Sequence, residues 1–434
     1  MDDMMAYSGA RYRVLPSRIG VSIPLTFVAL GALVLDPLFG SLAALVFLLA
    51  GGLLLLVSPA LAVRALLRHW YVLVLPAYCL VSALWSQYPM LTVRYSVQLG
   101  ITIAIAIVIA YRVAPATFLR CLFGIYSIGI VGSLLFGRVR DDIGAWLGIF
   151  GSKNAFAAVV SGFALTAIAI VFDRSAHWMV RLAALAGLAI SGPLLIAAQS
   201  AGAVLVVIPA VAVAIAVIFS RRMSPLQKAF MNIMTASCGI LIALVVAGYG
   251  DVLFESLLYF SGKDVTLTGR TELWDYGLQV TAEHPWLGVG YQAFWVQGNE
   301  AAEMLWASFG IASREGFNFH NTYISNAVEI GIVGLAIQVL MLYGAWVGTL
   351  VWALRAPGPD NAFLAGFLTL VICASFGEVA VFFQFSVTSI IAVCALVYAA
   401  QANQAWKRRG HPLRLGYVEP PMRARGEEGL PGHS

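Results

Sequence analysis

The chain has 434 residues, of which 61% are hydrophobic and 11% charged, and its formal net charge is +5. Soluble domains carry about 25% charged residues, and a soluble fold of this length could not bury so much apolar surface, so the composition predicts an all-α polytopic membrane protein. The five cysteines all fall in apolar runs, which offers neither a disulfide framework nor a cysteine-based metal site.

The chain opens with a polar, mildly basic segment, residues 1–19, which shows no signal-peptide cleavage pattern. A membrane-spanning helix needs about 20 apolar residues. We therefore expect about twelve transmembrane helices, nine within residues 20–250 and three within 321–401, followed by a disordered tail at 402–434. The expected spans are 20–36, 40–57, 70–86, 96–112, 117–135, 154–172, 181–198, 203–220, 230–250, 321–353, 361–380 and 382–401.

Lysine and arginine are unevenly distributed over this predicted topology. Nineteen of the 26 fall in the termini and short loops of one side. Because cytoplasmic loops carry the positive excess, both termini are expected in the cytoplasm and segment 251–320 in the periplasm. Seven basic residues fall on the outer side, where they either pair with nearby acids or serve another role. These seven are Arg94, Arg138, Arg140, Lys153, Lys263, Arg270 and Arg314.

Segment 251–321 is the only long polar stretch between apolar runs. It carries nine acidic and three basic residues, a net charge of −6, which excludes a general basic patch for nucleic acid. Isolated arginines in an acidic loop instead indicate a specific anion site, because the planar guanidinium makes paired, charge-assisted hydrogen bonds with phosphate. Arg270 and Arg314 are the candidates within this loop.

Residues 271–283 of the loop have a helical pattern. Trp274, Leu278 and Thr281 are spaced to lie on one helix face, and Pro285 follows as a stop signal. A group of aromatic residues comes next, which is expected either at the level of the lipid headgroups or stacked on sugar rings. This group consists of Trp286, Tyr291, Phe294 and Trp295.

Two histidines of the loop are candidates for proton transfer. His320 stands where loop becomes helix, beside Asn321, which can orient polar groups. Neutral imidazole is the side chain best suited to accept a proton near pH 7, although a structural role at the helix boundary is the alternative. His284 stands in His-Pro-Trp-Leu-Gly, a sequence more typical of a turn than of direct chemistry.

Two acidic residues fall within expected spans, Glu329 and Glu378. Acids inside membranes are costly and often functional. Glu329 is nine residues past His320 and so lies on about the opposite helix face, where we expect it to satisfy neighbouring helices. Gly331 and Gly334 close by indicate tight helix packing.

In their order and spacing, the motifs of residues 70–340 resemble the O-antigen ligase and Wzy-type polymerase superfamily. About twelve spans and one large periplasmic loop late in the chain agree with that resemblance. The motifs are Trp85-Ser86-Gln87-Tyr88-Pro89, Gly151-Ser152-Lys153-Asn154, Gly269-Arg270 with Trp274, His284-Pro285-Trp286-Leu287-Gly288-Val289-Gly290, and His320-Asn321-Thr322-Tyr323 with Glu329-Ile330-Gly331.

The resemblance implies glycosyl transfer at the periplasmic face from an undecaprenyl-diphosphate glycan, with neither metal ion nor cofactor. The acceptor is lipid A–core in the ligases and a second lipid-linked repeat in the polymerases. The family's loop arginine corresponds to Arg270 and its essential histidine to His320. A further family arginine is replaced by Ala201 in Gln199-Ser200-Ala201-Gly202, a pattern more similar to exopolysaccharide polymerases of the ExoQ type.

The resemblance assigns the catalytic roles to two residues. Arg270 would neutralise the departing diphosphate, and His320 would take the proton of the attacking hydroxyl. Arg94 or Lys153 would complete the diphosphate site in place of the missing arginine, and no Asp-x-Asp motif offers a metal site. The expected substrate-binding residues are Arg94, Lys153, Arg314, His284, Asn321 and Trp274.

A polymerase is the first functional hypothesis, and a ligase acting on lipid A–core or on protein is the second. A secondary transporter is the alternative of another class, although no inverted repeat is evident. A structural scaffold for polysaccharide secretion is the simplest alternative. The expected partners are the lipid-linked oligosaccharide and membrane lipid, with a chain-length regulator or a flippase as further candidates.

Overall fold

The computed structural model describes residues 20–141, 143–224, 226–228 and 269–409. Helices make up almost all of its regular structure, and a small antiparallel hairpin joins β1 (Arg138–Val139) to β2 (Trp146–Gly148). The helices are α1 (Ser22–Val34), α2 (Asp36–Phe39), α3 (Ser41–Leu56), α4 (Pro59–Arg68), η2 (Trp70–Leu73), α5 (Val74–Val81), η3 (Ser82–Leu84), α6 (Pro89–Arg112), α7 (Pro115–Phe136), α8 (Lys153–Phe172), α9 (Trp178–Ala197), α10 (Ala201–Ser220), α12 (Arg270–Glu283), α13 (Glu300–Ser308), α14 (Thr322–Arg355), α15 (Pro359–Ala374) and α16 (Val387–Arg409).

Seven helices of the described residues are long and apolar enough to cross a membrane, or eight if α3 and α4, bent by 97°, form one broken span. The prediction of an all-α polytopic membrane protein is therefore confirmed. The number twelve is not, because α1, residues 70–84 and α15 are shorter apolar helices and the expected span 230–250 lies outside the described residues. The seven long helices are α6, α7, α8, α9, α10, α14 and α16.

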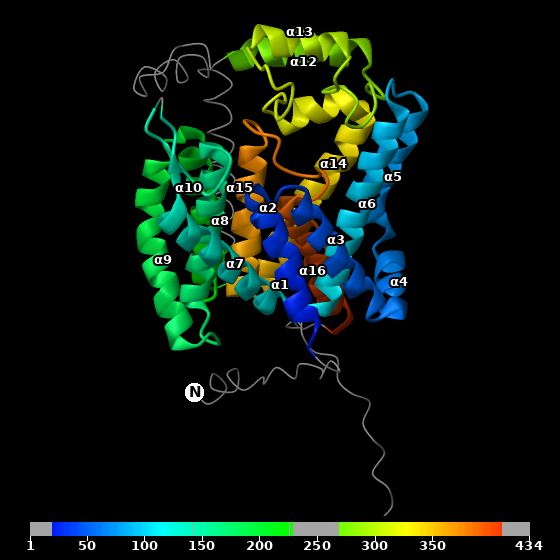
Figure 1. Cartoon of the computed structure of the whole chain (residues 1–434). Coiled ribbons are helices and arrows are strands. Elements are labelled where there is room, and N and C mark those ends of the chain that lie inside the picture. The colour runs from blue at the N-terminus through cyan, green and yellow to red at the C-terminus, as the bar shows by residue number, and fades with distance from the viewer. Residues whose placement is uncertain (1–19, 142, 225, 229–268, 410–434) are drawn as a thin grey trace, which may run out of the picture.

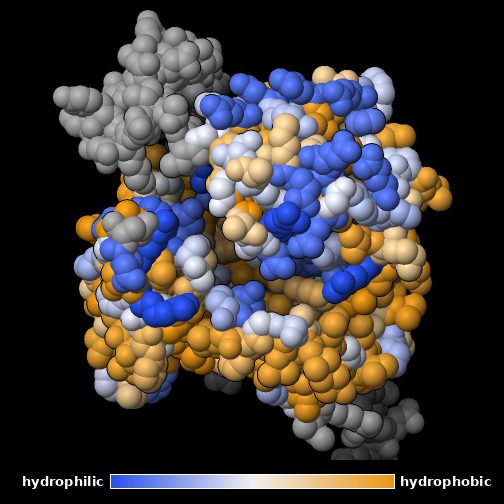
Figure 2. Space-filling model, turned by 45° about the horizontal axis from the view of Figure 1, so that its top comes forward, coloured by the Kyte–Doolittle hydropathy of each residue, from blue (hydrophilic) through white to orange (hydrophobic). Residues whose placement is uncertain are grey.

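The long helices stand side by side, and α12 and α13 lie across one end of the bundle (Figure 1). Helix α8 packs against α7, α9 and α10, while α16 packs against α6 and α14. Hydrophilic residues gather at the end that carries α12 and α13, and hydrophobic residues cover the sides below it (Figure 2). This distribution is the one expected of a bundle surrounded by lipid with one polar cap.

Helix α12 confirms the helix predicted in the long loop, and its burial shows which residues face the rest of the protein. The structure buries Leu273 and Gly277, whereas Leu278 is 53% exposed. Of the aromatic residues after α12, Tyr291 and Phe294 are buried, so neither lies at a surface where it could meet a headgroup. Trp286 is the one that is exposed.

Helix α14 is broken near its start, at Gly331, whose φ is 64° and ψ −175°. The loop 284–290 fills the break and pairs with the backbone groups that the helix leaves open. The amide of Ile332 donates to the Pro285 carbonyl at 2.8 Å. The other contacts are Val289 N to Val328 O at 2.9 Å and Gly290 N to Glu329 O at 2.8 Å.

Glycine is required on both sides of this junction. A Cβ atom on Gly331 would overlap the Trp286 carbonyl, and one on Gly288 would overlap the backbone of Glu329. Both residues also have a positive φ, which side chains other than glycine rarely adopt. The His-Pro-Trp-Leu-Gly-Val-Gly motif therefore fixes the cap onto α14, and Gly331 serves this break rather than close helix packing.

Candidate active site

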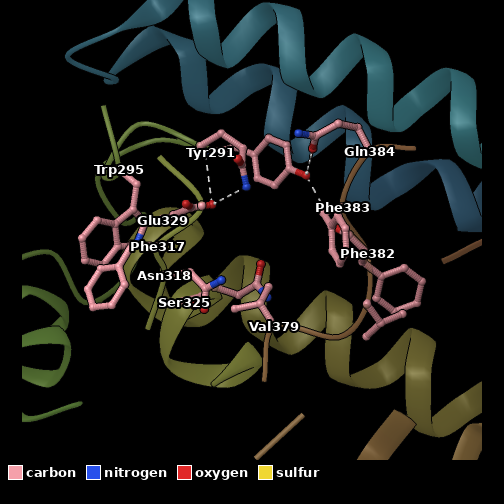
Figure 3. Close-up of a pocket in the computed structure, with 14 residues that line it drawn as sticks. Tyr291, Trp295, Phe317, Asn318, Ser325, Glu329, Val379, Phe382, Phe383 and Gln384 are labelled. Carbon is pink, nitrogen blue, oxygen red and sulfur yellow. Dashed lines mark hydrogen bonds between the residues drawn. The ribbon is translucent and has the colours of Figure 1, made fainter. Parts of the chain in front are cut away.

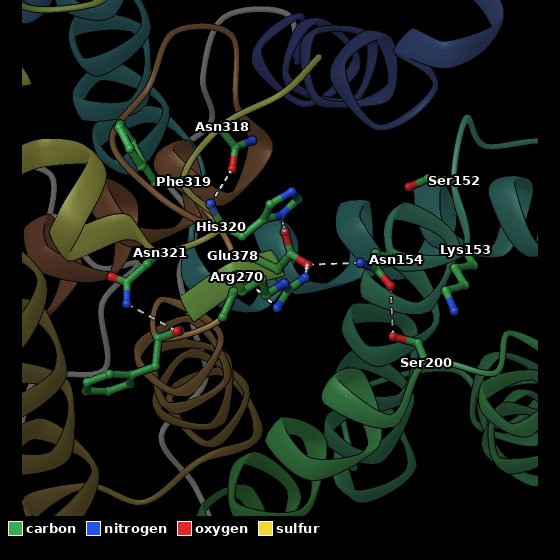
Figure 4. Close-up of polar contacts among 12 residues, drawn as sticks. Ser152, Lys153, Asn154, Ser200, Arg270, Asn318, Phe319, His320, Asn321 and Glu378 are labelled. Atoms are coloured by element: carbon green, nitrogen blue, oxygen red, sulfur yellow. Dashed lines mark hydrogen bonds and ion pairs between the residues drawn. The ribbon is translucent and has the colours of Figure 1, made fainter. Parts of the chain in front are cut away.

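Polar side chains from distant parts of the chain meet at the carboxylate of Glu378 (Figure 4). Its Oε2 atom lies 3.0 Å from Nδ1 of His320, and its Oε1 atom accepts from Nη2 of Arg270 at 3.1 Å. Nδ2 of Asn154 donates to the same Oε1 at 2.9 Å. We call His320, Arg270, Glu378 and Asn154 the polar group.

Glu378 does not lie in a membrane-spanning helix, as the expected span 361–380 would require. Helix α15 ends at Ala374, and residues 375–386 form a non-helical connection to α16. The start of α14 holds this connection, because Thr322 Oγ1 donates to the Glu378 carbonyl at 2.8 Å and accepts from the Ala380 amide at 2.9 Å. The carboxylate is therefore presented at the end of the bundle that carries the cap.

Arg270 is the first residue of α12 and follows Gly269, whose left-handed backbone (φ 76°) allows the chain to turn into the helix. Besides Glu378, its guanidinium binds the carbonyl of Gly377, with Nη1 donating at 2.9 Å. Arginine has five N–H donors. Two of them are engaged by residues that the structure describes, and its side chain is 23% exposed.

His320 is held in an unusual backbone conformation, with a φ of 48°. Its amide donates to Oδ1 of Asn318 at 2.7 Å. Asn321 then caps α14, accepting from the amides of Tyr323 and Ile324 at 2.9 and 3.2 Å. The strained backbone of His320 and the N-cap residue Asn321 together direct the imidazole toward Glu378 rather than along the helix.

The fourth member of the polar group, Asn154, comes from the second residue of α8. Its Oδ1 accepts from Oγ of Ser200, just before α10, at 3.1 Å. Lys153 lies beside it, and its Nζ donates to the Gln199 carbonyl at 3.4 Å. The Gly-Ser-Lys-Asn and Gln-Ser-Ala-Gly motifs thus meet at the polar group.

The charge of Glu378 is favoured by its partners. Burial alone would raise its pKa, but the hydrogen bond from His320 and the charges of His320 and Arg270 outweigh burial, so the pKa lies below its usual value. An ionised Glu378 accepts from Nδ1, which places the imidazole hydrogen there and the lone pair of a neutral ring on Nε2. That arrangement suits a base.

The remaining predicted residues lie outside the polar group. Trp274 and Asn321 are engaged structurally, since Nε1 of Trp274 donates to the Phe319 carbonyl at 2.8 Å and Asn321 caps α14. His284 is exposed at the end of α12. Substrate contact by any of these three stays a prediction.

Two predicted arginines have other neighbours. Arg314 forms an ion pair with Glu303, Nε to Oε2 at 3.1 Å, and its side chain is largely exposed. The guanidinium carbon of Arg94 lies 5.6 Å from the ring centre of Tyr95. No hydrogen bond or ion pair in the described part of the chain joins either arginine to the polar group.

The contacts of Glu378 with His320, Arg270 and Asn154 were not predicted from the sequence. The signal for Glu378 was an acid in an expected membrane span, and Asn154 stood beside the selected Lys153 in the same motif. Among the described residues, no three His, Cys, Asp or Glu side chains lie together so as to hold a metal ion.

Comparison with known proteins identifies the family of the chain. The chain belongs to the O-antigen ligase and Wzy-type polymerase family, and a family model described as O-antigen ligase matches residues 186–339, which contain Arg270 and His320. It is similar to the exopolysaccharide production protein ExoQ of Rhizobium meliloti (strain 1021), with 31% identity over 321 residues, 72% of each chain. The protein is thus a multi-pass membrane enzyme of the ligase or polymerase type.

Proposed function

We propose that the protein polymerises undecaprenyl-diphosphate-linked oligosaccharide repeats of an exopolysaccharide at the periplasmic face of the inner membrane. The observation that carries this proposal is the contact of Glu378 with both His320 and Arg270, at 3.0 and 3.1 Å. Glu378 thus holds a candidate base, His320, beside a cation, Arg270, that can bind the leaving diphosphate. Similarity to the exopolysaccharide production protein ExoQ supports a role in making an exopolysaccharide.

In the proposed reaction His320 takes the proton of the acceptor hydroxyl at Nε2. The hydroxyl oxygen forms a bond to the anomeric carbon of the donor as the bond from that carbon to the diphosphate oxygen breaks. The diphosphate leaves with the electron pair, and one such displacement inverts the anomeric carbon. Glu378 positions the imidazole and stabilises the imidazolium that results.

Arg270 binds the diphosphate in this mechanism, with Lys153 as the second cation. The engaged donors of Arg270 fix its plane against Gly377 and Glu378, which leaves its other N–H groups for phosphate oxygens. Lys153 lies on the same side as Asn154 and Ser200 (Figure 4), where the family's further arginine is replaced by Ala201. We propose that this pair makes a divalent metal unnecessary.

The first test replaces His320 with alanine in the purified full-length protein, supplied with lipid-linked repeats from producing cells. We expect turnover per folded molecule to fall about 10²–10⁴-fold with donor binding retained, because a base acts on the transition state. His177→Ala is the matched control, an exposed histidine at the start of α9 with no hydrogen bond or ion pair to the polar group among the described residues, and should keep wild-type turnover. Equal turnover of His320→Ala and wild type would refute the assignment.

The second test concerns the guanidinium. Arg270→Lys keeps the charge but loses the planar fork, so we expect at least a tenfold loss of turnover. Arg174→Lys, at an exposed arginine in the connection between α8 and α9, should have no effect. Full activity of Arg270→Lys would show that paired hydrogen bonds to the diphosphate are not needed.

The O-antigen ligase family match favours a second candidate, transfer of a finished glycan to lipid A–core. Product analysis separates the two reactions. A polymerase lengthens chains when lipid-linked repeat is the sole substrate, whereas a ligase forms product when lipid A–core is added. Neither comparison supports the transporter or the scaffold.

A further inference from the structure

A cavity of about 250 Å³ adjoins the polar group. Three of its lining residues lie next to catalytic residues. The ring of Phe317 is centred 5.9 Å from the imidazole of His320, Asn318 accepts from the His320 amide at 2.7 Å, and Val379 follows Glu378 in the chain. Neither Lys153 nor Asn154 is among the residues that line the cavity, and in Figure 4 Asn318 lies on the other side of His320 from Asn154.

Aromatic rings form two opposite walls of this cavity (Figure 3). Trp295 and Phe317 make one wall, with ring centres 5.2 Å apart. Phe382 and Phe383 make the other, and Phe383 is only partly buried. Flat apolar walls suit a ligand that has an apolar face.

Polar groups with unused hydrogen-bonding capacity lie between the walls. Oε2 of Glu329 accepts from the Gln292 amide at 3.0 Å, while no hydrogen bond among the described residues engages its Oε1. Nδ2 of the buried Asn326 donates to the Thr322 carbonyl at 2.8 Å, and no hydrogen bond among the described residues engages its Oδ1, which also belongs to the cavity lining. Buried polar groups are normally paired, so these two indicate a ligand that carries hydroxyl groups.

A sugar ring combines these properties, since its C–H face is apolar and its hydroxyls both donate and accept. The volume lies just below the range of about 300–1,000 Å³ that is usual for small-molecule sites, which fits one sugar residue rather than a longer glycan. No Lys or Arg lines the cavity within the described residues, and its lining includes the carboxyl group of Glu329, so nothing there would neutralise an acidic sugar.

We infer that this cavity binds one uncharged sugar residue of the acceptor and presents its hydroxyl to His320. The inference rests on the proposed function, because it assigns the acceptor side of the same reaction. Donor and acceptor then approach His320 from different sides, with the diphosphate near Arg270 and Lys153 and the acceptor sugar between the aromatic walls.

The test measures binding of a soluble probe, the oligosaccharide repeat released by mild acid from the lipid-linked repeat of producing cells. Titration of the purified full-length protein by calorimetry gives the Kd without any need for turnover. We expect Phe383→Ala to raise Kd at least tenfold, and Phe383→Leu, which keeps apolar volume but loses the flat ring, to raise it several-fold. Phe376→Ala is the matched control, since Phe376 belongs to the same connection but lies outside the cavity and is 57% exposed.

A second probe is the same repeat oxidised at its primary hydroxyls to carboxylates, which should bind at least tenfold more weakly to the wild type. Equal Kd values for wild type and both Phe383 variants would overturn the inference, as would equal or tighter binding of the oxidised repeat. If binding depends on Phe383 but the wild type transfers no sugar, the proposed function fails while the sugar site stands. If the wild type transfers sugar but neither the acceptor KM nor the Kd differs between wild type and the Phe383 variants, the sugar site fails while the proposed function stands.

Discussion

Replacing Glu378 with glutamine tests the polar group most directly. The carboxylate accepts from three donors, Nδ1 of His320, Nη2 of Arg270 and Nδ2 of Asn154. An amide supplies one acceptor oxygen and one NH2 donor. If its oxygen keeps Arg270 and Asn154, the NH2 group faces Nδ1 and moves the imidazole hydrogen to Nε2, where the lone pair is needed. If the amide flips, its NH2 group faces Nη2 of Arg270 and Nδ2 of Asn154, and both of these donors lose their acceptor.

Either orientation of the amide is unfavourable, and the first removes the base. Hydrogen bonds to charged groups contribute about 1.5–3 kcal/mol each, and a positioned base about 10²–10⁴ in rate. Since about 1.4 kcal/mol corresponds to a factor of ten, we expect kcat to fall about 10²-fold or more. The assay is turnover per folded molecule with lipid-linked repeats, and Glu378→Asp, which retains the charge, should recover part of the activity.

Glu303→Gln is the matched control, because Glu303 pairs with exposed Arg314 elsewhere in the cap. It should leave kcat unchanged. A kcat of Glu378→Gln within threefold of wild type would refute the role of the carboxylate in orienting His320.

The lowered pKa of Glu378 adds a dependence on pH. A carboxyl group whose pKa is lower in the folded state stabilises the fold fully above the usual value of 4.5, and that contribution is lost as pH falls through the lower folded pKa. The thermal unfolding temperature of the wild type should therefore decline more steeply below about pH 4.5 than that of Glu378→Gln. Parallel curves would contradict the shift.

Three further predictions concern the junction, the topology and the metal. Gly331→Ala should lower the free energy of unfolding by about 2–5 kcal/mol, because the alanine would be left-handed and would overlap the Trp286 carbonyl. Gly344→Ala in the same helix has open space and should be neutral. Unfolding curves in detergent measure both free energies. In a cysteine-free background, Gln297→Cys should react with an impermeant thiol reagent in intact spheroplasts and Ala176→Cys, at the opposite end of α8, should not; the reverse pattern would invert the topology. Chain extension should continue in excess EDTA, and inhibition that magnesium reverses would refute a metal-independent reaction.

The membrane helices and α12 could be predicted because each carries its own local signal, an apolar run or a periodic pattern with stop residues. Arg270 and His320 could be selected because they stand in motifs. Glu378 could not be placed, since an apolar run of the right length conceals a break, and the break at residue 375 depends on bonds to Thr322 from another helix.

Pairing within the cap was equally hidden from the sequence. Arg314 appeared to be an isolated cation, but folding brings Glu303 to it. Nothing in the His-Pro-Trp-Leu-Gly-Val-Gly motif indicates that it pairs with the break in α14, a helix that follows only after α13. Such contacts arise from tertiary geometry, which periodicity and composition do not encode.

The connection between α15 and α16 has a consequence for how the enzyme is made. The ribosome synthesises α8, α12 and His320 before residues 375–380. The nascent chain therefore contains His320 and Arg270 before it contains Glu378, the carboxylate that contacts both. The Thr322 amide also waits for the Ser375 carbonyl, its partner at 2.8 Å. Insertion of α15 and α16 therefore completes the polar group, and we expect a chain truncated before α15 to enter the membrane but to be inactive.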